Sequence, residues 1–160
     1  MQLLDSSMRP LQVLQDTSVS GITVSHDFIY CTDVYPAIIT SYEIAKDFAK
    51  AREESFDDGP YQGLVHPTLG PNGILYVIAF PDDEQYDEEH TDEVLALDAN
   101  TLALRFTFGC GRLEKEAFGM ALVGNELYVG DRQAWALQIF SLAGEHLREV
   151  RGDWRQPDSL

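Results

Sequence analysis

An all-β fold is the class that the sequence predicts, and three observations carry the prediction. Between Phe118 and Gly152, apolar and polar residues alternate in short runs that Gly and Asn interrupt, as in half-buried antiparallel strands joined by turns. The same pattern occurs twice more upstream, and no helical periodicity fits as well. We therefore expect a β-propeller-like arc of four-stranded antiparallel blades, with about three complete blades and partial blades at both ends.

Three tyrosines mark the repeat. Tyr76 follows Tyr30 by 46 residues, and Tyr128 follows Tyr76 by 52 residues. This period of about 50 residues lies in the range that indicates propellers or solenoids. Placing Gly21 under Gly119 aligns Tyr30 with Tyr128 without a gap. We therefore expect the three tyrosines to occupy equivalent positions in successive blades.

The expected units follow one another in a single partial propeller domain, residues 1–160. They are 1–16 as the tail of a blade, 21–53 as a blade, 63–109 as a blade with an acidic insertion, 114–152 as a blade, and 153–160 as the start of a next blade. In the last full unit we expect strands at 119–123, 126–131, 135–142 and 147–151. Residues 45–52 are good helix formers, but we expect a strand because the other units have one there.

The charge balance narrows the choice of partners. The chain has 27 acidic and 11 basic residues, a formal net charge of −16, and 44% hydrophobic residues. Such a surface repels a phosphate backbone and anionic lipids, so we expect neither a nucleic-acid nor a membrane partner. The first 16 residues lack the pattern of a signal peptide, and no run reaches 18 apolar residues. A cytoplasmic protein is expected.

Candidate binding residues lie in the connections. In a propeller, the loops between second and third strands and those between blades converge on one face, which we call the loop face. Exposed aromatic residues beside charges are typical anchors of protein interfaces. For the two tryptophans, packing between neighbouring blades is the competing interpretation. We expect the binding surface to include Asp33, Tyr35, Tyr86, Asp131, Arg132, Trp135 and Trp154.

The acidic segment 82–93 has eight carboxylates in 12 positions. It lacks the alternating ligands and the central glycine of an EF-hand. A block of like charges is usually solvated, and a docking surface for a basic partner or a cation site are the other interpretations.

Motifs of catalysis and metal binding are absent from the sequence. The four histidines are too scattered for a zinc motif, and the two cysteines, which we expect as reduced thiols, have no metal spacing. Neither GxSxG nor a phosphate-binding loop occurs. We therefore expect no metal, no cofactor and no catalytic residue.

One family resemblance rests on three short motifs. They are LYVGDR at 127–132, LQIF at 137–140 and AGE at 143–145. These residues resemble the NHL-repeat type of β-propeller, and the resemblance extends from Gly21 to Gly152 in three imperfect copies. It implies a propeller fold, and it leaves the function open because propellers host binding modules and enzymes alike.

One position departs from the NHL pattern. An arginine that commonly stands before the apolar pair of the third strand, where it can pair with the aspartate of the second strand, is replaced here by Ala136 and Ile38. We therefore expect Asp131 and Asp33 to accept hydrogen bonds from main-chain N–H groups at the strand end.

The sequence favours a non-catalytic protein-binding or scaffold module. One alternative is a metal-dependent hydrolase resembling the gluconolactonase-like propellers, whose metal is held by Glu, Asn and Asp in the central channel. The three asparagines, Asn72, Asn100 and Asn125, are expected in turns away from that channel. Another alternative is a structural subunit that completes a ring with another chain, by self-association through open blade edges or with a different protein.

Overall fold

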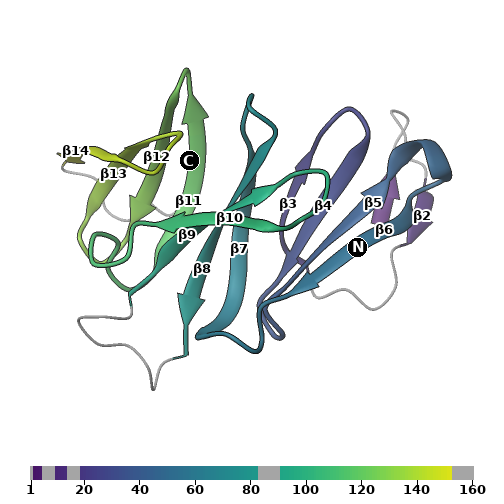
Figure 1. Cartoon of the computed structure of the whole chain (residues 1–160), viewed down its shortest axis with the longest axis horizontal. Helices are drawn as coiled ribbons and strands as arrows, with labels where there is room; N and C mark the ends of the chain where they lie inside the picture. The colour runs from purple at the N-terminus through teal and green to yellow at the C-terminus, as the bar shows by residue number, and fades with distance from the viewer. Residues whose placement is uncertain (1, 5–9, 14–18, 83–90, 153–160) are drawn as a thin grey trace.

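The computed structural model describes residues 2–4, 10–13, 19–82 and 91–152, and its account of side chains covers the last two ranges. Figure 1 shows three four-stranded sheets in a row, with the N-terminal hairpin at the end of the row. In this part of the chain, the one helical element is the 3-10 turn η1 (Ile44–Lys46). The predicted all-β arc of four-stranded antiparallel blades is therefore confirmed.

Every sheet is a simple meander of antiparallel strands in chain order. The hairpin consists of β1 (Gln2–Leu4) and β2 (Pro10–Val13). Blade 1 is β3 (Val19–Val24), β4 (Phe28–Asp33), β5 (Ile38–Glu43) and β6 (Ala49–Ser55). Blade 2 is β7 (Tyr61–Leu69), β8 (Ile74–Pro81), β9 (Glu93–Asp98) and β10 (Leu104–Phe108). Blade 3 is β11 (Ala117–Val123), β12 (Glu126–Asp131), β13 (Ala136–Ser141) and β14 (His146–Arg151).

Strand limits differ from the prediction at a few places. The outer strand of blade 1 exists but begins at Ala49, because η1 and two left-handed residues, Asp47 and Phe48, turn the chain before it. Trp135 precedes β13 instead of starting it, since its φ of 53° belongs to a turn. Residues 5–9, 14–16 and 153–160, where a turn and the start of a next blade were expected, lie outside the described residues.

Blade 2 buries both of its faces. Along β8, side chains alternate between two neighbours: Leu75, Val77 and Ala79 pack with blade 1, whereas Tyr76 and Ile78 pack with blade 3. All five have 0% of their surface exposed. A strand covered on both sides is expected to read as a continuous apolar run, as ILYVIAF does here.

The repeated tyrosines join each blade to the next. Tyr30 of blade 1 donates its hydroxyl to the carbonyl of Ala99 at 3.0 Å, just after β9. Tyr76 of blade 2 donates to the carbonyl of Leu142 at 2.8 Å, just after β13. Tyr128 has the same register on the second strand of blade 3, where it lies opposite β13. The predicted equivalence of the three tyrosines is therefore confirmed.

The turn that presents the Ala99 carbonyl is built by Asp98. Its Oδ1 accepts hydrogen bonds from the main-chain N–H groups of Asn100 at 3.0 Å and Thr101 at 2.9 Å. Its Oδ2 pairs with the guanidinium of Arg105. The bond from Arg105, followed by that from Thr101, lowers the pKa of Asp98 to about 2.

Removing the hydroxyl of Tyr76 tests the link between blades 2 and 3. In Tyr76→Phe, the carbonyl of Leu142 and the amide of Asn72 both lose a partner. We expect the free energy of unfolding in urea to fall by about 1–2 kcal/mol, the usual cost of a buried hydrogen bond. The control Tyr35→Phe removes an exposed hydroxyl and should change it by less than about 0.5 kcal/mol. Equal losses in both variants would contradict this role.

The ionised carboxylate of Asp98 predicts that the free energy of unfolding depends on pH. A carboxyl whose pKa is lower in the folded protein than the unfolded value of about 3.9 stabilises the fold above that value. This stabilisation is lost as the pH falls towards 2. Urea unfolding between pH 5 and pH 2 should therefore show a steeper loss of stability for the wild type than for Asp98→Asn. Parallel profiles would contradict the prediction.

Candidate functional site

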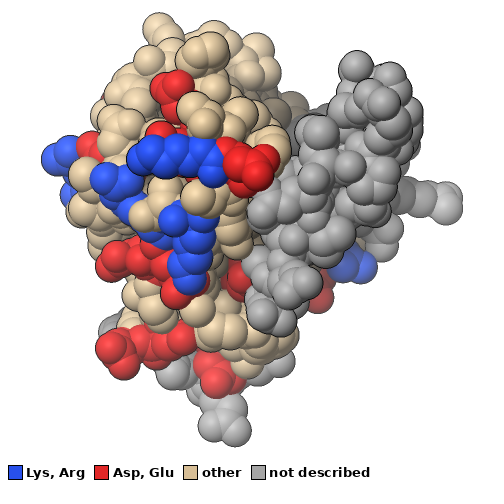
Figure 2. All heavy atoms as spheres, turned by 90° about the vertical axis from the view of Figure 1, so that its right-hand side faces the viewer, with Lys and Arg blue, Asp and Glu red and all other residues tan. Residues whose placement is uncertain are grey.

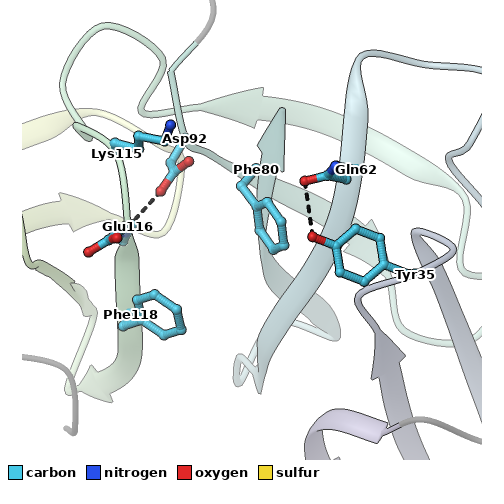
Figure 3. A pocket seen from close by; sticks show the side chains of 8 residues that line it. Tyr35, Gln62, Phe80, Asp92, Lys115, Glu116 and Phe118 are labelled. Atoms are coloured by element: carbon cyan, nitrogen blue, oxygen red, sulfur yellow. Dashed lines mark hydrogen bonds between the residues drawn. The ribbon is translucent and has the colours of Figure 1, made fainter. Parts of the chain in front are cut away.

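The candidate site is a pocket of about 170 Å³ at the loop face, where all three blades contribute residues (Figure 3). Tyr35 comes from the connection after β4 in blade 1. Blade 2 supplies residues in or next to the ends of β7, β8 and β9, and the remaining wall comes from the connection before β11 and the start of β11 in blade 3. The lining residues are Tyr35, Gln62, Phe80, Asp92, Lys115, Glu116, Ala117 and Phe118.

One wall joins blade 1 to blade 2 through a single hydrogen bond. The hydroxyl of Tyr35 donates to Oε1 of Gln62 at 3.2 Å, and Figure 3 shows this pair at the right of the pocket. Tyr35 keeps 65% of its surface exposed. Its ring is therefore positioned by the protein and still available to a ligand.

Two phenylalanines supply the apolar part of the pocket. The ring of Phe80 lies against Gly63, where an added Cβ would come within 2.4 Å of Cζ of Phe80 and 2.7 Å of the carbonyl oxygen of Val34. Phe118 meets the ring of His66 edge to face at 5.7 Å between centroids. Burial lowers the pKa of His66, so this imidazole is an uncharged partner at neutral pH.

Charged side chains form the opposite wall. Asp92 is 1% exposed, and its Oδ2 accepts the main-chain N–H of Ala117 at 2.6 Å. Glu116 pairs through Oε2 with Nη1 of Arg132 at 3.3 Å. Together with half-buried Lys115, these groups place both signs of charge beside aromatic rings. The arrangement suits an apolar or aromatic side chain that is flanked by polar groups.

Asp131 is buried and has a structural role instead of forming part of the binding surface. It is 0% exposed, its Oδ1 accepts the N–H of Ala134 at 2.9 Å, and its Oδ2 accepts the N–H of Glu114 at 3.1 Å. Burial raises the pKa of Asp131, while these two hydrogen bonds act in the opposite direction. The expected main-chain partners are confirmed for this residue. The Asp131 carboxylate thereby links the segment before β11, which contains Glu114, to the β12–β13 turn, which contains Ala134.

The remaining predicted binding residues are spread over the loop face. Tyr35 lines the pocket, and Arg132 reaches it through Glu116. Trp135 is 48% exposed in the β12–β13 turn, and Asp33 is half-buried at the end of β4. Tyr86 and Trp154 lie outside the described residues.

Sequence reasoning missed most of the pocket. Phe80 and Phe118 belong to strands, where they look like any other apolar strand residue. Gln62 is a single polar residue near the start of β7, and none of the three belongs to a motif. Lys115 and Glu116 stand in a connection that was not singled out. The position of these residues in the repeat could have indicated the pocket, because strand ends next to the connections between blades lie on the loop face.

The hydrolase alternative gains no ligands at this pocket. Asn72, Asn100 and Asn125 lie in the turns β7–β8, β9–β10 and β11–β12, as expected, and none of them lines it. Among the described residues, no three or more His, Cys, Asp or Glu side chains are grouped so that they could hold a metal ion.

In the described ranges, no helix is long and apolar enough to cross a membrane.

Comparison with known proteins gives a structural likeness alone. Neither a protein-family model nor a curated protein sequence matches the chain. The WD40 repeats of RRP9 align with a TM-score of 0.66 at 15% identity, over 89% of this chain and 41% of that one. The β-propeller domain of Cps50 (Swd1) from Myceliophteria thermophila aligns with a TM-score of 0.59 at 12% identity, over 88% and 43%.

A functionally unknown protein from Desulfotomaculum acetoxidans aligns with a TM-score of 0.65 at 18% identity, over 93% of this chain and 49% of that one. The chain thus spans less than half the length of each of these three structures. At such low identities the likeness shows the fold and nothing finer. The chain has a β-propeller fold.

Proposed function

We propose that the chain is a non-catalytic protein-binding module, or part of a scaffold, whose loop face holds a segment of a partner protein. The observation that carries this proposal is the pocket built by three blades, with Tyr35, Phe80 and Phe118 beside charged and amide groups. A small apolar centre with a polar rim is the usual construction of a protein interface. The partner would insert one apolar or aromatic side chain between these rings.

Exposed aromatic area outside the pocket supports the same assignment. Trp135 lies in the β12–β13 turn of the loop face, next to the chain that carries Arg132. Aromatic residues supply much of the binding energy of protein interfaces because they bury a large area at little entropic cost. Of the two interpretations of Trp135, its 48% exposure favours the contact surface over packing between blades.

The subtype and limits of the module are part of the proposal. The motifs at 127–132, 137–140 and 143–145 support an NHL-type propeller. The carboxylate of Asp131 accepts hydrogen bonds from main-chain N–H groups, where the common repeat offers an arginine. This arrangement is compatible with an NHL repeat that lacks the arginine. We propose one partial propeller domain over residues 1–160, with the acidic segment as an insertion in blade 2.

Selection of peptides by the immobilised 160-residue chain tests the binding function. We expect enriched peptides to share an apolar or aromatic residue. Their affinity for Tyr35→Ala should fall at least about 10-fold, which corresponds to about 1.4 kcal/mol and is typical of an interface anchor. Isothermal titration calorimetry on the purified variants gives the measurement.

A matched control comes from the outer edge of blade 2. Leu104 is also exposed, at 48%, but lies on β10 away from the pocket, so Leu104→Ala should bind the selected peptides as the wild type does. Enrichment of no peptide, or peptides whose affinity is the same for both variants and for Trp135→Ala, would contradict binding at the loop face.

A further inference from the structure

Gln62 is a polar residue of the pocket whose amide is only partly used within the protein. An amide side chain can donate two hydrogen bonds through its nitrogen and accept two through its oxygen. In the part of the chain that the structure describes, the side chain of Gln62 has one hydrogen bond, which Oε1 accepts from the hydroxyl of Tyr35 at 3.2 Å. Gln62 is half-buried where it lines the pocket. Both N–H groups of Nε2 are therefore available to a ligand.

A β-bulge sets the position of Gln62. Tyr61 of β7 lies opposite Pro81 of β8, whereas Gly63 lies opposite Phe80, so Gln62 is the extra residue between the two pairs. A bulge redirects a side chain, and bulges are frequent beside functional sites. Gly63 lets β7 approach the ring of Phe80 closely, since an added Cβ would come within 2.4 Å of Cζ. The amide and this ring therefore belong to one fixed part of the pocket.

The pocket has room for one aromatic ring. Its volume is about 170 Å³. A cavity of roughly 150 Å³ lined by apolar side chains can hold a benzene molecule. Figure 3 shows the ring of Phe80 between Gln62 on one side and Phe118 on the other. A six-membered ring that enters the pocket would thus meet aromatic side chains and the Gln62 amide together.

Charge does not decide which side chain the pocket takes, although the net charge of the chain is −16. Figure 2, which views the blade 1 end of the row, shows Asp and Glu among Lys and Arg on the described surface. The pocket itself holds the carboxylates of Asp92 and Glu116 and the ammonium of Lys115. Glu116 in turn pairs with Arg132. A charged anchor would therefore give up its hydration for a lining that is close to neutral, which favours an uncharged anchor.

An anchor with an apolar tip would bury the Gln62 donors without a partner. A side chain that enters the pocket takes the place of the solvent around the amide. A buried donor that lacks an acceptor costs more than a typical hydrogen bond contributes. A site with such a group therefore discriminates strongly against a ligand that lacks the matching hydroxyl. The phenol oxygen of tyrosine accepts a hydrogen bond, whereas phenylalanine has no acceptor and the indole N–H of tryptophan only donates.

We propose that the anchor of the partner protein is a tyrosine and that Gln62 selects it. This inference rests on the proposed binding function and names the side chain that the pocket takes. The tyrosine ring lies against Phe80 and Phe118, and Nε2 of Gln62 donates to its phenol oxygen. Oε1 of Gln62 continues to accept from Tyr35, so the amide joins the pocket wall to the ligand.

Selection from a library of random peptides, carried out in parallel on the wild type and on Gln62→Met, tests this inference. Methionine is unbranched like glutamine but has no N–H donor. We expect the wild type to enrich peptides that share a tyrosine, which phenylalanine does not replace. Gln62→Met should enrich phenylalanine at least as often as tyrosine at that position, and Gln62→Leu serves as a second variant with the same expected result.

Isothermal titration calorimetry on one selected peptide measures the contact itself. Replacing the shared tyrosine of the peptide by phenylalanine should lower its affinity for the wild type at least about 10-fold, because the amide donor is then buried without a partner. The same replacement should change the affinity for Gln62→Met by less than about 3-fold, since the group that the hydroxyl contacts is already absent.

A matched control makes the same substitution elsewhere on the loop face. Gln133 lies in the β12–β13 turn and does not line the pocket. Gln133→Met should therefore retain both the preference for tyrosine and the affinity of the wild type. Circular dichroism confirms that each variant is folded.

The possible outcomes separate this inference from the proposed function. Selected peptides that bind equally well with tyrosine or phenylalanine, or that share a different residue, would overturn the role of Gln62 and leave binding at the loop face standing. A preference for tyrosine that persists in Gln62→Met would overturn it as well. If the wild type enriches no peptide, the proposed function and this inference are both contradicted.

Discussion

The contact between the faces of neighbouring blades is the constraint on which the rest of this structure depends. A single four-stranded sheet has two faces and too little thickness to bury either one by itself. Blade 2 resolves this by packing each face on a different neighbour, so that five consecutive residues of β8 are fully buried. The apolar area gained in both contacts is the main driving force that holds the arc together.

Apolar contact alone would let the blades slide, and the tyrosines restrict that motion. A buried phenol must find an acceptor, and for Tyr30 and Tyr76 the acceptor is a carbonyl at one defined turn of the next blade. The direction of the hydrogen bond fixes how one sheet is set against the other. The pocket at the loop face depends on this setting, because Tyr35, Gln62 and Phe118 come from three different blades.

The repeat could be predicted from the sequence because its signals are local. The alternation of residues in β12 and the tyrosine spacing reflect a pleat and a register that each blade repeats. The resemblance to the NHL repeat, in which an arginine commonly stands where this chain has Ala136, also predicts the main-chain partners of Asp131. The pocket could not be predicted in the same way, because Phe80 and Phe118 look like any other apolar strand residue until three blades are placed together. The alternation also places Trp135 in a strand, because a positive φ leaves no mark in the pattern of apolar and polar residues.

The three blades differ at equivalent positions where their surroundings differ. The first residue of the second strand is Phe28 in blade 1 and Ile74 in blade 2, and both pack toward the following blade. In blade 3 the same register holds Glu126, which is paired with Arg148. An ion pair at this position tolerates water and also tolerates burial better than a lone charge. The Glu126–Arg148 pair therefore suits blade 3, which no described blade follows, whereas Phe28 and Ile74 suit positions that the next blade covers.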